Sequence, residues 1–384
     1  MSTYSKRDLP SVITKRDNMD NFPDRLLELA IQIQQIPAPT LAEGPRGEFV
    51  RGRFIEEGLK DVSMDSQGNV YGRLPGKNKK AGPLIISAHL DTVFPEKTNL
   101  AVNRDADRIS APGIGDNSIG VAALFGILWL LREREIELKG DVWFVADVCE
   151  EGLGDLRGMK AVVDHFGANV LAYLVLEGMA LGHIYHRAIG VRRYRVTART
   201  AGGHSWSDYG QPSAVHEIAA LVTQLAAIPL PHAPRTTLNV GVMTGGTSVN
   251  TLAAEASFDL DLRSEDASVL AGLVKTAEEL ISTANKPGVR SDAEVIGQRP
   301  AGEMSANHPL VKLAETCLHE QGLDITFTSG STDANVPLSR GLPALVLGVT
   351  TGGGAHTTHE YIDTAPIEQG IGQLLMFVER AFGE

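Results

Sequence analysis

Residues 84–94, LIISAHLDTVF, constrain the fold more than any other stretch of this 384-residue chain. The apolar residues 84–86 are continuous rather than alternating, which is typical of a strand buried on both faces of a parallel sheet. The run ends abruptly at His89, and Asp91 follows two residues later. In open α/β sheets the reactive groups lie just beyond the carboxyl ends of the strands, so the stretch predicts a sheet and its functional edge. A strand-end histidine bonded to a nearby aspartate would give the same pattern.

Other apolar runs end in the same way. Residues 141–148 lead into Glu150 and Glu151, and residues 171–176 lead into Glu177. Parallel strands place their carboxyl ends at one edge of the sheet, so side chains far apart in the sequence can converge there. Each acidic residue also has a plainer interpretation, such as a solvated surface turn for the pair at 150–151.

Two more candidates enter on glycine-rich segments. Asp116 lies in GIGDNSIG at 113–120, ahead of a hydrophobic helix, and would alone be taken for a helix N-cap. His356 follows a strand at 344–348 after a glycine-rich turn. The loop at 113–120 lacks the Lys-Ser/Thr of a phosphate-binding P-loop, which argues against a nucleotide enzyme. Five oxygen and nitrogen donors without a thiolate predict a two-metal hydrolytic site: His89, Asp116, Glu151, Glu177 and His356.

The middle of the chain has a different pattern. Residues 190–297 read as strand, helix, strand, strand, helix and strand, and ASFDLDLR at 256–263 alternates cleanly. This order predicts a ferredoxin-like module with one exposed sheet face. We therefore expect an α/β catalytic domain with a mixed, mostly parallel sheet flanked by helices, formed by residues 1–188 and 298–384. An α+β lid formed by residues 189–297 is inserted into it.

Composition narrows the class of protein. The formal net charge of −12 argues against nucleic acid or an anionic membrane as a partner. The two cysteines provide no disulfide framework. The N-terminal residues 1–18 carry charges but no apolar segment, and the longest apolar stretch, 121–131, is too short to cross a bilayer. We expect a soluble, cytoplasmic protein with no membrane partner.

Local signals also predict where elements begin. Thr40, with Glu43 three residues later, is a capping-box pattern that predicts a helix from residue 40 to residue 58. Residues 62–64 and 70–74 are expected to form a hairpin.

The motifs in combination resemble the M20 family of zinc-dependent peptidases and amidohydrolases, which includes tripeptidase T, glutamate carboxypeptidases and aminoacylases. The resemblance covers nearly the whole chain. It rests on the inserted module and on HLDTVF at 89–94, GIGDNSIG at 113–120, EEGLGDLRG at 150–158, LEG at 176–178 and HTTHE at 356–360. It implies an α/β catalytic domain with an inserted lid that often forms a homodimer contact.

The resemblance also implies roles for single residues. Asp116 would bridge two Zn²⁺ ions, with Mn²⁺ or Co²⁺ as alternatives, and the peptide bond after it would be cis. His89 and Glu177 would complete one metal site, and Glu151 and His356 the other. His356 and His359 are alternative candidates for the last metal-ligand position. In the family this ligand usually lies four residues before the glutamate of the motif, which favours His356.

Further residues resemble the family's catalytic and substrate-binding positions. Glu150 is similar to the general base, and Asp91 is placed to take the other ring N–H of His89. His204 in the lid resembles the residue that stabilises the oxyanion, often from the other subunit. Asn250 and Arg263 resemble substrate-binding positions, and an arginine fork suits a carboxylate. The plainer alternatives are a turn cap for His204, a turn residue for Asn250 and an exposed charge for Arg263.

These expectations converge on a two-metal exopeptidase that hydrolyses small peptides, similar to tripeptidase T. The first alternative is an N-acyl-amino-acid amidohydrolase on the same scaffold. The second is a binding protein that has lost catalysis, which the presence of Glu150 and all five candidate ligands argues against.

Overall fold

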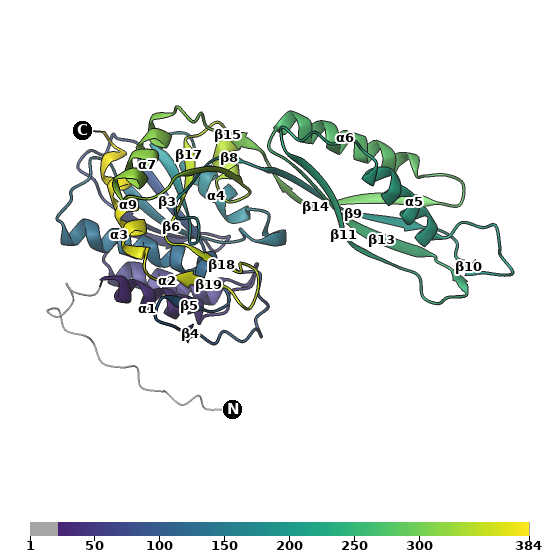
Figure 1. Cartoon of the computed structure of the whole chain (residues 1–384), viewed down its shortest axis with the longest axis horizontal. Coiled ribbons are helices and arrows are strands. Elements are labelled where there is room, and N and C mark those ends of the chain that lie inside the picture. Colours follow the sequence, from purple (N-terminus) through teal and green to yellow (C-terminus); the bar gives the residue numbers. More distant parts are fainter. Residues whose placement is uncertain (1–21, 384) are drawn as a thin grey trace.

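The computed structural model describes residues 22–383. Figure 1 shows a rounded body, which contains the first and last helices, and an elongated body formed by the middle of the chain. The charged N-terminal residues 1–18, in which the sequence shows no apolar segment, lie outside the described residues.

The rounded body is built on a mixed sheet of nine strands in the described chain, in the order β1-β2-β6-β3-β7-β17-β8-β15, with β16 on β8. Its centre, β6-β3-β7-β17, is parallel, as predicted, while β2 runs antiparallel to β6. Every residue of β3 is buried, which explains its unbroken apolar run. The strands are β1 (Lys60–Met64), β2 (Val70–Leu74), β3 (Leu84–His89), β6 (Val142–Asp147), β7 (Ala172–Glu177), β8 (His183–Ala188), β15 (Gly302–Glu303), β16 (Thr326–Gly330) and β17 (Ala344–Gly348).

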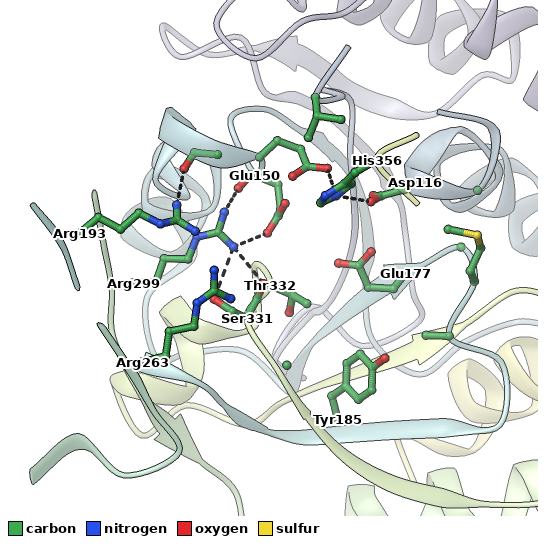
Figure 2. Close-up of a pocket in the computed structure, with 18 residues that line it drawn as sticks. Asp116, Glu150, Glu177, Tyr185, Arg193, Arg263, Arg299, Ser331, Thr332 and His356 are labelled. Carbon is green, nitrogen blue, oxygen red and sulfur yellow. Dashed lines mark hydrogen bonds and ion pairs between the residues drawn. The ribbon is translucent and has the colours of Figure 1, made fainter. Parts of the chain in front are cut away.

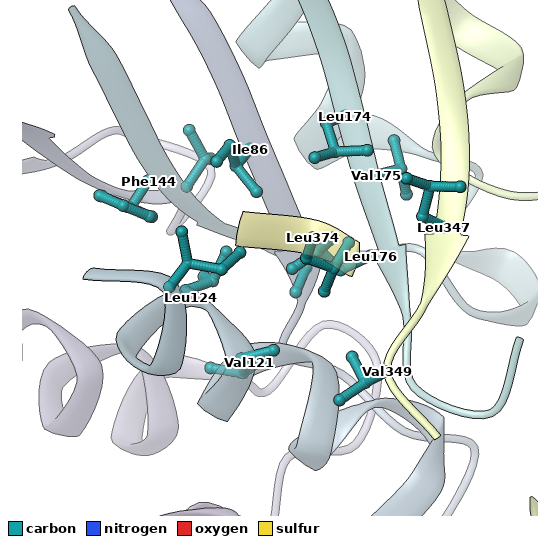
Figure 3. Close-up of a cluster of buried hydrophobic side chains, with 14 of the residues drawn as sticks. Ile86, Val121, Leu124, Phe144, Leu174, Val175, Leu176, Leu347, Val349 and Leu374 are labelled. Atoms are coloured by element: carbon teal, nitrogen blue, oxygen red, sulfur yellow. The ribbon is translucent and has the colours of Figure 1, made fainter. Parts of the chain in front are cut away.

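Helices cover this sheet and enclose its hydrophobic core. Figure 3 shows Ile86, Phe144 and Leu174 of the sheet close to Leu124 of α3 and Leu374 of α9. The helices of this body are α1 (Phe22–Gln34), α2 (Gly44–Glu56), α3 (Ile119–Glu133), α4 (Arg157–Phe166), α7 (Pro309–Glu320), α8 (Asn335–Ser339) and α9 (Ile367–Arg380). A small second sheet contains β4 (Asn103–Arg104), β5 (Arg108–Ser110), β18 (Gly352–Gly353) and β19 (Tyr361–Asp363).

The segment Ile114–Glu133, which ends in α3, has the length and apolar composition of a membrane span. Its most apolar window is 89% buried inside the fold. The segment is thus the central helix of the core, where sheet and helices cover it on all sides.

The prediction of a helix from residue 40 is wrong, because α2 begins at Gly44. The Glu43 carboxylate does not return to the amide of Thr40. Its Oε1 accepts hydrogen bonds from the amides of Leu41 and Cys149, at 2.9 and 3.2 Å. Glu43 therefore ties this turn to the segment after β6, a contact that a local capping pattern cannot reveal. The predicted hairpin is present as β1 and β2.

The elongated body, which we call the lid, runs from Gly190 to Arg299. Its antiparallel sheet has the ferredoxin-like order β11-β13-β9-β14. Helices α5 and α6 pack on one face over a separate hydrophobic cluster. The other face carries cross-strand ion pairs such as Arg195–Asp259. The elements are β9 (Gly190–Arg199), α5 (Ala214–Ala226), β11 (Thr236–Gly245), β13 (Glu255–Ser264), α6 (Ala267–Thr283) and β14 (Arg290–Arg299), with β10 (Gly203–His204) and β12 (Thr251–Leu252) at the tip. The last strand continues past residue 297, where we expected the lid to end.

Candidate metal centre

The candidate ligands converge at the carboxyl edge of the large sheet. Asp116 lies between two imidazoles: its Oδ1 is 3.0 Å from His89 Nε2, and its Oδ2 is 3.1 Å from His356 Nε2. His356 Nε2 is also 3.1 Å from Glu151 Oε1, and His89 Nε2 is 3.9 Å from Glu177 Oε2. Three groups of three donor atoms, each within 4.8 Å of one another, are found in the described chain: His89 with Asp116 and Glu177, Asp116 with Glu151 and His356, and His89 with Glu150 and Glu151. All five predicted side chains therefore meet at one place, and Figure 2 shows three of them, Asp116, Glu177 and His356.

Asp116 is held in a tight turn, η1 (Ile114–Ser118), and the peptide bond that follows it is cis, as expected. The fully buried Glu360 supports this turn from the other end of the chain. Its Oε1 accepts hydrogen bonds from the amides of Gly115 and Asp116, at 2.7 and 2.8 Å. Burial raises the pKa of Glu360 to about 7. The sequence analysis assigned no role to Glu360, and its place in the HTTHE motif was the only signal.

Asn117 joins the turn to the end of β7. Its Nδ2 donates to the carbonyl of Leu176 at 2.8 Å, and its Oδ1 accepts from the amide of Gly178 at 3.0 Å. The backbones approach so closely that a Cβ at Gly178 would lie 2.0 Å from the carbonyl oxygen of Gly115. These contacts place Glu177 beside Asp116, and the sequence analysis did not identify them.

Asp91 lies beside His89, as expected, and its carboxylate has additional partners. Its buried carboxylate accepts the amide of Glu150 at 2.9 Å and the amide of Glu151 at 2.8 Å. His89 Nδ1 lies 3.0 Å from the backbone carbonyl of Asp91 and 3.6 Å from its Oδ1. Both the backbone carbonyl and the carboxylate of Asp91 therefore lie beside Nδ1 of His89, and the carboxylate also anchors the acidic segment after β6.

The charges of the cluster are strongly coupled. Burial by itself would raise the pKa of Asp116, but hydrogen bonds to His356 and His89 outweigh it and hold that pKa below its usual range. Hydrogen bonds to Asp116 and Glu151 raise the pKa of His356 to about 10. Burial raises the pKa of Glu177 well above its usual value. In the metal-free protein, protonated His89 and His356 thus supply the positive charge that stabilises the neighbouring carboxylates.

The donor set fits two divalent cations. Each oxygen of Asp116 faces a different imidazole, and each imidazole has a further carboxylate beside it. Histidine nitrogen and carboxylate oxygen are ligands that suit zinc and related metals. Cys149 contributes no nearby thiolate, because it is buried and burial raises its pKa to about 12.

A cavity of about 540 Å³ opens beside the cluster. Its metal-facing wall includes Asp116, Glu150 and Glu177, and arginines line the side toward the lid (Figure 2). Burial raises the pKa of Glu150 to about 8, and the charge of Arg299 only partly offsets this effect. Arg263, which was expected to bind the substrate, lines the cavity. Arg193 and Arg299 line it too, although they carry no motif by which the sequence analysis could have found them.

The other two predicted lid residues do not line this cavity. His204 lies in β10 at the tip of the lid, away from the large sheet (Figure 1). Its amide donates to Asp208 Oδ2 at 2.7 Å, and the amide of Ser205 donates to the carbonyl of Asn250 at 2.9 Å. Within one chain, His204 and Asn250 are therefore neighbours of each other and distant from the metal-ligand candidates. His359 is exposed and does not line the cavity either.

Comparison with known proteins places these features in context. The sequence model of Peptidase family M20/M25/M40 matches residues 85–380. The uncharacterized protein YqjE of Bacillus subtilis is 25% identical over 364 residues, which cover 90% of this chain and 94% of that protein. A probable carboxypeptidase of Aspergillus terreus is 27% identical over 337 residues, covering 82% and 74%. The crystal structure of a Staphylococcus aureus tripeptidase aligns with a TM-score of 0.80 at 23% identity, covering 94% of this chain and 98% of that one. The predicted α/β fold is confirmed.

Proposed function

The chain belongs to peptidase family M20/M25/M40 and is a hydrolase of that family, and we propose that it is a two-metal exopeptidase that cleaves small peptides. The observation that carries this proposal is the position of Asp116, whose two carboxylate oxygens each face a separate imidazole, of His89 and of His356. A single carboxylate placed in this way can bridge two cations. The tripeptidase among the similar structures supports a peptide as the substrate.

In this proposal, His89 and Glu177 hold one cation, Glu151 and His356 hold the other, and Asp116 contacts both. The cations are Zn²⁺, with Mn²⁺ or Co²⁺ as alternatives. Such a pair, when bound, acidifies a water molecule and polarises the amide carbonyl. Asp91 keeps the two neighbouring glutamates in their separate roles by holding both of their amides.

Glu150 is the proposed general base. Its carboxylate takes a proton from the attacking water and delivers it to the leaving nitrogen. A raised pKa suits both steps, because the group then holds the proton between them. The position of Glu150 on the wall of the cavity, next to the candidate ligands, supports this assignment.

Arg263 is the proposed partner of the free carboxylate of the substrate. Its side chain is 41% exposed and contacts Asp261, so part of the guanidinium faces the cavity. A planar guanidinium can bind both oxygens of a carboxylate. This contact favours substrates in which the scissile amide lies close to a free carboxylate.

We also propose a homodimer formed through the lid, with His204 and Asn250 reaching the cavity of the partner subunit. Strand β11 is an edge of the lid sheet, and its Val242 and Met243 are exposed, which supports pairing with a second copy. The measurement is the molar mass from light scattering. A monomer that is fully active at all protein concentrations would contradict the proposal. A cytoplasmic location agrees with the two free, buried cysteines and is tested by cell fractionation.

The substrate test compares tripeptides, dipeptides and N-acyl amino acids, each with chelator and after Zn²⁺, Mn²⁺ or Co²⁺ is added back. Tripeptides blocked at one end or the other report which terminus is recognised. We expect metal-dependent cleavage of peptides and its loss in Glu150→Gln. N-acyl amino acids are the second candidate, because they also present a carboxylate to Arg263. Turnover confined to them would replace the peptidase proposal with an acylase, and no turnover by the metal-loaded protein would indicate a binding protein.

A further inference from the structure

Arg299 makes the most completely enclosed ion pair of the cavity. It is the last residue of β14, and its side chain is buried. Nη1 lies 2.8 Å from Glu150 Oε1, and Nη2 donates to the backbone carbonyl of Glu150. Nη1 also donates to the carbonyl of Ser331 at 2.9 Å. Within residues 22–383, no other ion pair involves the carboxylate of Glu150.

The backbone around Arg299 is fixed to the rounded body, although Arg299 itself ends a lid strand. Asn335 Nδ2 donates to the carbonyls of Ile189 and Pro300, at 2.7 and 2.9 Å. These two residues lie on the two connections between the bodies, which we call the hinge. The amide of Ile189 also donates to the carbonyl of Gly330 at 2.7 Å. Arg299 is therefore held at a point that both bodies share.

We propose that Arg299 is a positioning residue that orients the carboxylate of Glu150 and links it to the hinge of the lid. The proposal rests on the role of Glu150 as general base. One oxygen of Glu150 is occupied by Arg299, which fixes the rotation of the carboxylate. The guanidinium also joins the Glu150 backbone to Ser331, so a displacement of the hinge would move the base.

Arg299 differs in this respect from Arg263. The side chain of Arg299 is 7% exposed and contacts Glu150 and Ser331, whereas that of Arg263 is 41% exposed. A lysine at position 299 could reach one of these acceptors but could not reproduce the planar fork that joins several. The geometry thus favours Arg263 as the residue that binds the substrate and Arg299 as the residue that orients the general base Glu150.

The first test is a double-mutant cycle with Arg299→Met, Glu150→Gln and the double variant, each loaded with Zn²⁺ and assayed on the best peptide. We expect Arg299→Met to lower kcat about 100-fold, the lower end of what a general base contributes, with little change in KM. If Arg299 acts through Glu150, the double variant loses no more activity than Glu150→Gln alone. Losses that multiply, or a raised KM with an unchanged kcat, would overturn the proposal.

Arg187→Met is the matched control, because Arg187 forms an exposed ion pair with Glu303, 3.1 Å away, near the same hinge. It should retain full kcat. Melting temperature and bound zinc are measured for every variant. If Arg299→Met does not fold, Arg299→Lys replaces it. An undiminished kcat in Arg299→Lys would show that a planar guanidinium is not needed to orient Glu150, which would contradict the proposal.

A second readout does not depend on activity. Amide hydrogen exchange of residues 149–154 should be faster in Arg299→Met than in the wild type or in Arg187→Met, because the Glu150 backbone loses its tether. Unchanged exchange would overturn the positioning role. If the wild type cleaves no amide at all, the proposed function fails, while the exchange experiment still decides whether Arg299 orders the segment that contains Glu150.

Discussion

The Nε2 atom of His356 lies 3.1 Å from Oδ2 of Asp116, although the two residues are 240 positions apart. In the metal-free protein this contact is an ion pair, since Asp116 and Glu151 raise the pKa of His356 to about 10. The imidazole contributes stability that is fully present below its unfolded pKa of about 6.5 and is lost as the pH rises through about 10. A cation bound at this place must first displace the imidazole proton.

We therefore predict that Zn²⁺ binding at pH 7 releases protons and that the apparent affinity rises with pH, by up to about tenfold per pH unit for each proton displaced. Calorimetry in two buffers with different ionisation enthalpies measures the number released. His356→Ala should reduce that number by about one, because one imidazole is lost, whereas the exposed His359→Ala should leave it unchanged. A heat of binding that does not depend on the buffer would contradict the prediction.

Asp91→Asn tests the anchor beneath the acidic segment. An amide side chain can accept one of the two backbone N–H groups of Glu150 and Glu151, but its NH₂ then faces the other. We expect unfolding to become easier by about 1–3 kcal/mol, because one buried donor loses its acceptor. Metal affinity should fall about 10- to 100-fold, as for other residues that support ligands. Urea denaturation and zinc titration give the two values, and Asp91→Asn with wild-type affinity would show that the anchor is dispensable.

The close contact at Gly178 gives a steric test. In Gly178→Ala, the new Cβ would lie 2.0 Å from the carbonyl oxygen of Gly115, so the turn of Asp116 and the end of β7 must separate. We expect lower metal content and a free energy of unfolding reduced by at least 1–3 kcal/mol, the range for overpacking. Gly272→Ala is the control: it lies in α6 with no atom within 4 Å of its Cβ and should stabilise the lid by about 0.5–1 kcal/mol. Bound zinc and thermal unfolding separate the two variants.

The fold could be predicted from the sequence where the pattern of apolar residues along a strand is clear. The apolar run of β3 and the alternation of β13 specify buried and half-buried strands directly. His89, Glu151 and Glu177 could be predicted because they lie at or just after the ends of such strands, whereas Asp116 and His356 were predicted from glycine-rich segments. Glu360, Asn117 and Arg299 could not, since each acts through contacts with segments distant in the sequence.

The same limit explains one wrong prediction and one incomplete prediction. Glu43 matches a local capping pattern, but besides the nearby amide of Leu41 its carboxylate accepts the amide of Cys149, 106 positions away. Asp91 lies beside His89 as expected, and its carboxylate also accepts the amides of Glu150 and Glu151, which the prediction did not include. In both cases a buried carboxylate bonds backbone amides that the fold, rather than the local sequence, brings to it.

Asp147, at the end of β6, and Asp333, just before α8, are fully buried, and their carboxyl groups interact with each other. Within the described chain, no hydrogen bond from a third group reaches any of their four oxygens. Burial raises the pKa of Asp147 to about 6, and the interaction with Asp333 offsets this rise only partly. Burial and the charge of Asp147 together raise the pKa of Asp333 well above its usual value. The pair is thus a site where the folded protein binds protons more tightly than the unfolded chain does.

The sign of the pH effect follows from these raised values. The contribution to stability is fully present below the unfolded pKa of about 4 and is lost as the pH rises through about 6. Asp147→Asn removes one ionisation and should make the metal-free protein more stable than wild type at pH 8, by an amount on the order of 1.4 kcal/mol per unit of pKa shift. At pH 5 the two proteins should differ little. Urea denaturation with chelator at both pH values measures this, with the exposed Asp324→Asn as control. If the curves of Asp147→Asn and wild type stay parallel from pH 5 to pH 8, the two buried carboxyl groups do not hold a proton in the folded protein.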